Sequence, residues 1–133
     1  MNYTPKYFTN KEILCPCGCG ARPSDEALIA LDNIRSEYGN PIYLEQGATC
    51  RDYSVNVVGR SSTSEHIELS DHKPTAFDIK KKTFRSKEDW LVFISIAIKY
   101  GFHSIGFGSY WVGAGNNTNT HIDMRSGKTW MYA

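Results

Sequence analysis

The stretch SEHIELSDHKPTAFDI, residues 64–79, organises the rest of the chain. Its last five residues, 75–79, have the character of a β-strand, which leaves Asp78 on the face opposite Phe77 and Ile79. An aspartate on an apolar strand is buried only when it is paired or coordinated. Asp78 is therefore the most informative acid of the chain, and we expect it to have a partner.

The segment THIDMR, residues 120–125, offers that partner. Its alternation predicts a strand that carries His121, Asp123 and Arg125 on one face. Two histidines and one aspartate drawn from these two segments would form the ligand set that holds a catalytic zinc ion and leaves one position open to water. The two segments together predict a zinc site.

Two helices are predicted outside these segments. Ser24 is a good N-cap, and apolar residues recur at helical spacing from there until Gly39. A second helix starts at Ser86 and ends at Gly101. It is apolar on most faces, so we expect it to lie across a sheet.

Short strands and loops fill the remainder of the chain. We predict a strand at residues 41–45, a loop at 47–60, a hairpin formed by 102–107 and 110–112, and a short strand or docked tail at 128–131. These elements indicate one α+β domain over residues 1–133, in which an antiparallel sheet has helices packed on one face. Residues 1–23 are expected to form an irregular arm rich in Cys and Gly.

The composition is ordinary for a globular domain. Of the 133 residues, 41% are hydrophobic and 22% are charged, and the net charge is +1. Such a chain has no basic field that would attract nucleic acid or an anionic membrane. The N-terminus has no apolar signal region, and the longest apolar stretch, residues 90–98, is too short for a membrane span. We expect a monomer that is made in the cytoplasm without a signal peptide.

Four cysteines form a separate feature. Cys15, Cys17 and Cys19 lie in the turn CPCGCG, and the fourth is Cys50. A four-thiolate zinc site is one interpretation, although zinc-binding cysteine pairs are usually separated by two to four residues and these alternate by one. A disulfide in an oxidising compartment and a set of small buried side chains in a Gly-rich turn are the others.

Several short motifs follow one another in a characteristic order. They are CPCGCG at residues 15–20, IR at 34–35, NPI at 40–42, VGR at 58–60, SEH at 64–66, AFDI at 76–79 and HIDMR at 121–125. In this order, and over nearly the whole chain, they resemble the M15 peptidases. That family holds D-Ala-D-Ala carboxypeptidases and phage cell-wall endopeptidases, and it shares a small α+β fold with the hedgehog signalling domain.

The resemblance implies a ligand set for Zn²⁺. Asp78 and His121 match two of the family's ligands directly. For the third, the spacing from the VGR motif selects His66, whereas the spacing back from Asp78 nearly selects His72. His66 is the preferred ligand and His72 its alternative. A longer loop before the strand is compatible with the site, because the entropic cost of closing a loop grows slowly with length.

The resemblance also implies substrate contacts and a general base. Arg51 and Ser64 match positions that contact the carboxylate and the amide of the substrate. Related chains place an acid shortly before the last histidine, whereas residues 116–120 here are Asn and Thr. Asp123 is the candidate general base, with Glu65 or Glu68 as other candidates, and Asp123 could instead orient an imidazole.

The function implied by the resemblance is a zinc metallopeptidase that cleaves peptide bonds of bacterial peptidoglycan. It would be phage or prophage encoded and would act on the wall after release or as part of the virion. The alternative is a non-catalytic zinc-binding structural or wall-binding module that retains the fold. A third hypothesis is a small interaction module stabilised by zinc on the four cysteines, whose metal would be lost on thiol alkylation.

Overall fold

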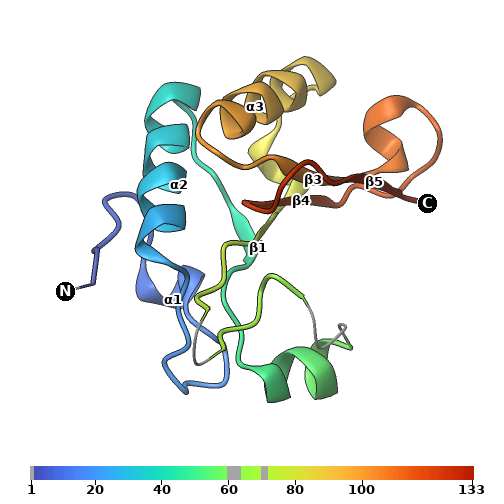
Figure 1. The fold of residues 1–133 in the computed structure, drawn as a ribbon. Helices are drawn as coiled ribbons and strands as arrows, with labels where there is room; N and C mark the ends of the chain where they lie inside the picture. The colour runs from blue at the N-terminus through green and yellow to red at the C-terminus, as the bar shows by residue number, and fades with distance from the viewer. Residues whose placement is uncertain (1, 60–63, 70–71) are drawn as a thin grey trace.

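The structure, a computed structural model, describes residues 2–59, 64–69 and 72–133. Its elements in chain order are α1 (Asn10–Ile13), α2 (Asp25–Tyr38), β1 (Leu44–Gln46), the π-helical η1 (Tyr53–Val58), β2 (Phe77–Ile79), the 3₁₀ turn η2 (Lys81–Thr83), α3 (Lys87–Lys99), β3 (Ser104–Gly108), the 3₁₀ turn η3 (Ser109–Val112), β4 (Thr120–Asp123) and β5 (Thr129–Tyr132) (Figure 1). The expected α+β fold class is confirmed.

The strands form one sheet in the order β1-β2-β4-β3-β5. Every pair is antiparallel except β3 and β5, which run parallel at one edge. The predicted hairpin at 102–112 is wrong, because the chain leaves β3 through η3 and a loop before it returns as β4. Gly108 permits this path, since a Cβ atom there would overlap the backbone of Asn117. The predicted strand or tail at the C-terminus is a strand, β5.

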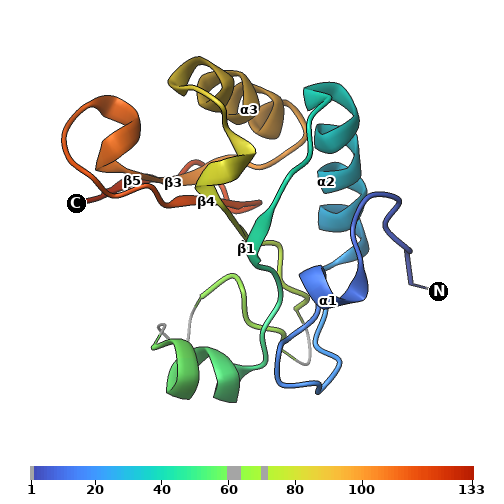
Figure 2. The same cartoon turned by 180° about the vertical axis from the view of Figure 1, so that it is seen from behind.

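Helices α2 and α3 lie on the same face of the sheet (Figures 1 and 2). Both begin as the sequence indicates, because the Ser24 hydroxyl accepts from the amide of Ala27 and the Ser86 hydroxyl accepts from the amide of Asp89. Helix α2 ends at Gly39, whose φ of 79° is the left-handed conformation that favours glycine. Local sequence therefore fixes the start of both helices and the end of α2.

The core fills the space between these helices and the sheet. It combines strand residues with residues of α2 and α3, among them Phe77, Ile79, Ile105 and Ile122 from the sheet, Leu28, Leu31 and Ile34 from α2, and Trp90, Phe93 and Ala97 from α3. The Trp90 indole donates to the Thr120 hydroxyl at 3.0 Å, which joins α3 to β4. The helix-facing side of the sheet is thus apolar, and the alternate residues of β2 and β4 point to the opposite side.

Helix α1, the cysteine turn that follows it and η1 lie on that opposite side, below the sheet in Figure 1, whereas the first residues of the N-terminal arm run beside α2. The arm contains the short helix α1, so it is less irregular than expected. The prediction of a loop over residues 47–60 is wrong in its second half, since residues 51–58 are helical and η1 ends at Gly59, with φ of 84°. Val57 and Val58 are exposed there, so no apolar periodicity marks the segment. Residues 60–63 of the polar loop lie outside the described residues.

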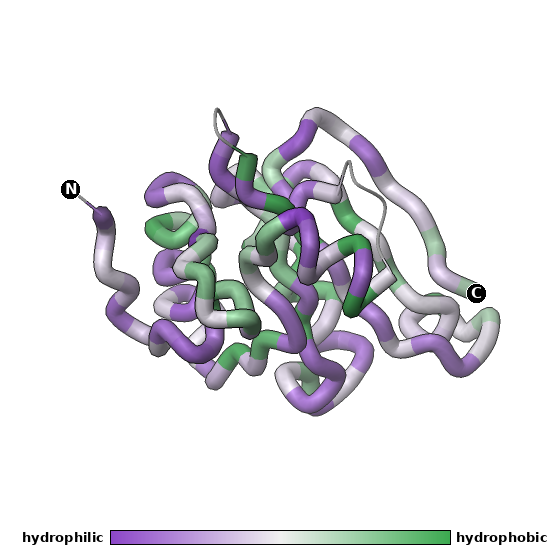
Figure 3. The backbone as a smooth tube through the Cα atoms, turned by 90° about the horizontal axis from the view of Figure 1, so that it is seen from below, coloured by the Kyte–Doolittle hydropathy of each residue, from purple (hydrophilic) through white to green (hydrophobic). Residues whose placement is uncertain are grey.

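Hydropathy is mixed along the whole chain. Figure 3 shows short hydrophobic stretches that are repeatedly interrupted by hydrophilic residues. In the described ranges, no helix combines the length and the apolar character needed to cross a bilayer. The two termini lie at opposite ends of the molecule (Figure 1).

Candidate metal centre

Strands β2 and β4 bring Asp78 and His121 together. The two residues are directly paired in the antiparallel register, so their side chains leave the sheet on the same side, away from the core. Nδ1 of His121 lies 3.0 Å from Oδ1 of Asp78. The pairing that the sequence predicted for Asp78 is thus present.

His66 reaches the same point from the loop between η1 and β2. Its Nδ1 lies 2.7 Å from the carbonyl oxygen of Gly47, and its own carbonyl accepts from the amide of Thr49 at 2.7 Å. Because a carbonyl oxygen only accepts, Nδ1 must carry the proton, which leaves a lone pair on Nε2. The backbone of residues 47–49 therefore sets the tautomer and the direction of the ring.

The Nε2 atom of His66 has no protein group that satisfies it. It lies 3.2 Å from Oδ2 of Asp78, yet it is buried and makes no well-aligned hydrogen bond within the described part of the chain. A buried polar atom without a hydrogen bond is costly unless it has another partner. A metal ion on the Nε2 lone pair would supply that partner.

Ligand atoms of His66, Asp78 and His121 all lie within 4.8 Å of one another. Two neutral imidazoles and one carboxylate form the protein ligand set of catalytic zinc sites, with a fourth position left for water or substrate. The three residues therefore fit a Zn²⁺ ion. Of the two histidines proposed for the third ligand, the fold brings His66 to this cluster. The ring of His72 is exposed, and its Nε2 lies 2.9 Å from Oε1 of Glu65.

Asp123 orients the ring of His121. Its Oδ2 lies 2.7 Å from Nε2 of His121, and Arg125 donates to the same carboxylate from Nε at 3.0 Å and from Nη2 at 2.6 Å. If Nε2 of His121 donates to Asp123, the lone pair of Nδ1 is free to face the cluster. Asp123 is fully buried. This position suits the orienting role rather than proton exchange with a water molecule.

The charges of this network shift its pKa values. Burial alone would raise the pKa of Asp78, but the adjacent rings of His121 and His66 hold it well below its ordinary value. Burial likewise opposes ionisation of Asp123, whose pKa is lowered by His121 and Arg125. For His121, burial favours the neutral ring, but Asp123 and Asp78 raise its pKa above the ordinary value. Both carboxylates are thus ionised at neutral pH.

Trp130 of β5 forms a wall of the site that sequence reasoning missed. Its ring centroid lies 5.1 Å from that of His121, and the guanidinium of Arg125 lies 5.7 Å from the Trp130 ring centroid. Gly106 makes room for the indole, because a Cβ atom there would lie 2.5 Å from the ring. The spacing of Trp130 and Tyr132 indicates that the two rings lie on the same face of a strand. The sequence does not show that this face lies beside His121, because that position depends on the parallel pairing of β5 with β3.

The cluster lies in a polar groove. A hollow of about 220 Å³ is lined by Ser64, Glu65, His66, Asp78, His121, Arg125, Trp130 and Tyr132. A larger one, of about 410 Å³, is lined by Glu45, Asp78, Ile79, Lys80, Lys81, Thr118, Asn119, Thr120, His121 and Tyr132. The two share Asp78, His121 and Tyr132, so they meet at the cluster. An extended ligand could therefore contact both hollows across the metal position.

The remaining predicted residues are divided between this groove and other surfaces. Ser64 lines the smaller hollow, and its hydroxyl accepts from the amide of His66 at 3.2 Å. Arg51 is exposed and lines a different hollow, together with Asp52, Val55 and Asn56. Glu68 accepts from Lys73 and from the amide of Arg22. Of Glu65 and Glu68, the two other candidates for the general base, Glu65 is the one that lines the smaller hollow.

The Glu65 carboxylate is held beside the cluster by two groups. Its Oε1 accepts from the hydroxyl of Thr75 at 3.1 Å and lies 2.9 Å from Nε2 of His72. Thr75 also accepts from the amide of Met124, which ties this carboxylate to the segment that follows β4. Glu65 is therefore positioned by the same framework as the ligands.

Comparison with known proteins agrees with this geometry. A family model described as Peptidase M15 matches residues 6–123, a range that contains all three clustered ligands and Asp123. No curated protein and no solved structure gives a significant match. The match covers most of the chain and confirms the resemblance that the motifs indicated. The chain belongs to the M15 peptidase family.

Proposed function

We propose that this M15 peptidase is zinc-dependent and hydrolyses peptide bonds of bacterial peptidoglycan. The observation that carries the proposal is the convergence of ligand atoms from His66, Asp78 and His121 within 4.8 Å in a polar groove. When bound there, Zn²⁺ supplies Lewis acidity toward the scissile carbonyl and lowers the pKa of a water molecule. The remaining steps are assigned to side chains of the groove.

Glu65 is the general base in this proposal. Its carboxylate lines the smaller hollow beside His66 and Asp78. A base must lie within hydrogen-bonding reach of the proton that it removes, directly or through one water. Asp123 is less suited to that role, because its carboxylate is fully buried and engaged by His121 and Arg125. Asp123 instead acts as a positioning residue for His121.

The groove supports a peptide substrate that carries charge. Glu45, Lys80 and Lys81 line the larger hollow, and Arg125 lines the smaller one. Stem and cross-bridge peptides of peptidoglycan carry free carboxylates and amines, which both signs of charge can bind. Ser64 lies close enough to the ligands to contact the substrate amide. A role for Arg51 in carboxylate binding stays a prediction, since Arg51 lines a separate hollow.

We infer that the enzyme is of phage or prophage origin and acts on the cell wall. A wall peptidase of phage or prophage origin would meet peptidoglycan either after release from the host cytoplasm or as part of the virion. Both routes use the same groove.

The test combines metal content with the release of peptides from purified peptidoglycan. We expect wild-type protein to bind zinc at this site and to release peptides, and His66→Ala and Asp78→Asn to lose both properties. His72→Ala is the matched control for zinc content alone, because His72 lies outside the ligand cluster. Zinc binding at the site without release of wall peptides would favour the alternative, a non-catalytic zinc-binding structural or wall-binding module.

A further inference from the structure

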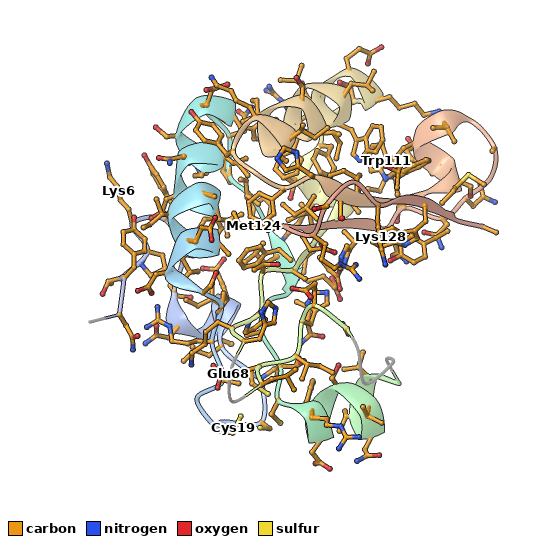
Figure 4. The ribbon with its side chains drawn as sticks, viewed as in Figure 1. Lys6, Cys19, Glu68, Trp111, Met124 and Lys128 are labelled. Carbon is orange, nitrogen blue, oxygen red and sulfur yellow. The ribbon has the colours of Figure 1, made fainter. Side chains whose placement is uncertain are left out.

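Four cysteine side chains converge at the end of the molecule opposite the helices. Cys15, Cys17 and Cys19 belong to the turn of the N-terminal arm, and Cys50 precedes the helical segment of η1. Their sulfur atoms all lie within 4.8 Å of one another. Figure 4 shows Cys19 at the bottom of the molecule, on the turn that lies beside that helical segment. The cluster is separate from the groove, since no cysteine lines either of the two hollows.

The sulfur separations fit a metal ion better than disulfides. The Sγ atoms of Cys15 and Cys17 are 3.4 Å apart, those of Cys17 and Cys50 3.7 Å, and those of Cys15 and Cys50 3.9 Å. A disulfide requires about 2.05 Å between sulfur atoms. Four thiolates at about 2.3 Å from a tetrahedral zinc ion are about 3.8 Å from one another. The observed distances lie near the edge length of that tetrahedron.

The backbone around the cluster is built to present the sulfur atoms to one point. Gly18, between Cys17 and Cys19, and Gly20, directly after Cys19, have φ values of 85° and 88°, which let the chain turn there so that the cysteines do not alternate in direction as in a strand. The amide of Cys50 donates to the sulfur of Cys15 at 3.3 Å, and the amide of Tyr53 donates to that of Cys50 at 3.4 Å. Amide donors of this kind favour a negatively charged sulfur.

The cluster is also connected to the segment that holds His66. Cys50 directly follows Thr49, whose amide donates to the carbonyl of His66, and Gly47 accepts from the His66 ring. On the other side, the amide of Ala48 donates to the carbonyl of Ile13, two residues before Cys15. Residues 47–50 thus lie between the cysteine cluster and a ligand of the peptidase site.

We propose that Cys15, Cys17, Cys19 and Cys50 bind one Zn²⁺ ion as a structural tetrathiolate site that fastens the N-terminal arm to residues 47–50. All four positions of this zinc are filled by protein, so the site has no open position for water and no catalytic role. The zinc ion would stabilise a turn that has little apolar packing of its own, because Cys17 and Cys19 are exposed and bury little surface. The site does not depend on whether the chain cleaves peptides.

Metal substitution with Co²⁺ tests this site directly. Cobalt bound by thiolates has sulfur-to-metal charge-transfer absorption in the near ultraviolet, which a site of imidazoles and a carboxylate lacks. We expect this absorption in the wild-type protein and in Asp78→Asn, and its loss in Cys17→Ser and Cys19→Ser. Zinc content should fall by one ion per chain in each cysteine variant and by one ion, from the other site, in Asp78→Asn. Failure of the peptidase proposal would therefore leave the cysteine result intact.

A second measurement uses wild-type protein, so that a variant that fails to fold does not decide the outcome. Addition of a mercurial thiol reagent to the zinc-loaded protein should release one zinc ion per chain to a chromogenic chelator, in proportion to the thiols blocked. Release of no zinc, absence of the charge-transfer absorption in wild type, or disulfides found by mass spectrometry in protein purified under reducing conditions would overturn the proposal. Zinc content unchanged in folded Cys17→Ser and Cys19→Ser would do so as well.

Discussion

Nε2 of His121 lies 2.7 Å from Oδ2 of Asp123, an aspartate with no exposed surface. Arg125 closes the other side of this carboxylate with two side-chain hydrogen bonds, and Nδ1 of His121 faces Asp78 at 3.0 Å. The result is a chain of four charged or polar groups that runs along β4 and crosses to β2. Because Asp78, His121 and Asp123 all lie on paired strands, the imidazole is oriented before a metal binds.

Replacement of Asp123 by Asn tests this orientation. The variant keeps the shape of the side chain but removes the charge that stabilises the Nε2–H donor of His121. We expect zinc affinity at the peptidase site to fall by about 10- to 100-fold. Competition titration against a chromogenic chelator measures the change. Asp52→Asn is the matched control, because the described hydrogen bonds of the Asp52 carboxylate are limited to one with the surface amide of Asn56, at 2.7 Å. An equal loss of zinc affinity in both variants would contradict the role of Asp123.

The pH dependence of the metal-free protein follows from the same network. Because the pKa values of Asp78 and Asp123 are lowered by folding, their contribution to stability is present above about pH 4 and is lost on acidification. The pKa of His121 is raised, so its contribution is present below about pH 6.5 and is lost as the pH rises through the folded value. We expect the free energy of unfolding to be greatest between these limits. Urea denaturation across the pH range measures it.

Asp123→Asn should flatten this profile on both sides, because one depressed carboxylate disappears and the pKa of His121 loses its strongest support. The exposed His103 provides the comparison. His103→Gln should leave the profile unchanged. A wild-type profile that rises steadily from pH 4 to pH 9 would contradict the contribution of His121, whose raised pKa requires stability to fall at high pH.

Glu65→Gln separates catalysis from metal binding. If Glu65 removes a proton during hydrolysis, its amide variant should lower turnover by about 10²- to 10⁴-fold while zinc content stays at the wild-type level. Glu68→Gln is the control, because Glu68 lies in the same loop but pairs with Lys73 at 2.8 Å. Turnover of Glu65→Gln within a few fold of wild type would assign the base to another group.

The two long helices could be predicted from the sequence because interactions between neighbouring residues set their ends. The caps at Ser24 and Ser86 and the left-handed Gly39 define the two long helices. Strand alternation likewise placed Asp78 and His121 on the face away from the core, because the side-chain period of a strand is independent of its partners. Direct pairing of the two residues in the register then made the site.

What the sequence left open depends on contacts between distant segments. The choice between His66 and His72 is made by backbone groups of Gly47 and Thr49, nearly twenty residues earlier in the chain. The convergence of Cys50 with the cysteines of the arm spans 35 residues. Residues 51–58 lack an apolar stripe because they cover no core, so periodicity could not reveal their helical turns.

The parallel pairing of β5 with β3 is the third such contact, and it gives Gly106 and Trp130 a testable dependence on each other. A Cβ atom at Gly106 would lie 2.5 Å from the indole of Trp130, so Gly106→Ala must displace the ring from His121. We expect a loss of about 1–3 kcal/mol in the free energy of unfolding from this overpacking. In a Trp130→Ala background the obstacle is gone, and the same substitution should be neutral or stabilising, by up to about 1 kcal/mol, because alanine has less backbone entropy to lose than glycine. Urea denaturation of the four proteins gives the coupling energy of the pair. Equal effects of Gly106→Ala in both backgrounds would mean that the indole is not held against β3, and Trp130 could then not be counted as a wall of the metal site.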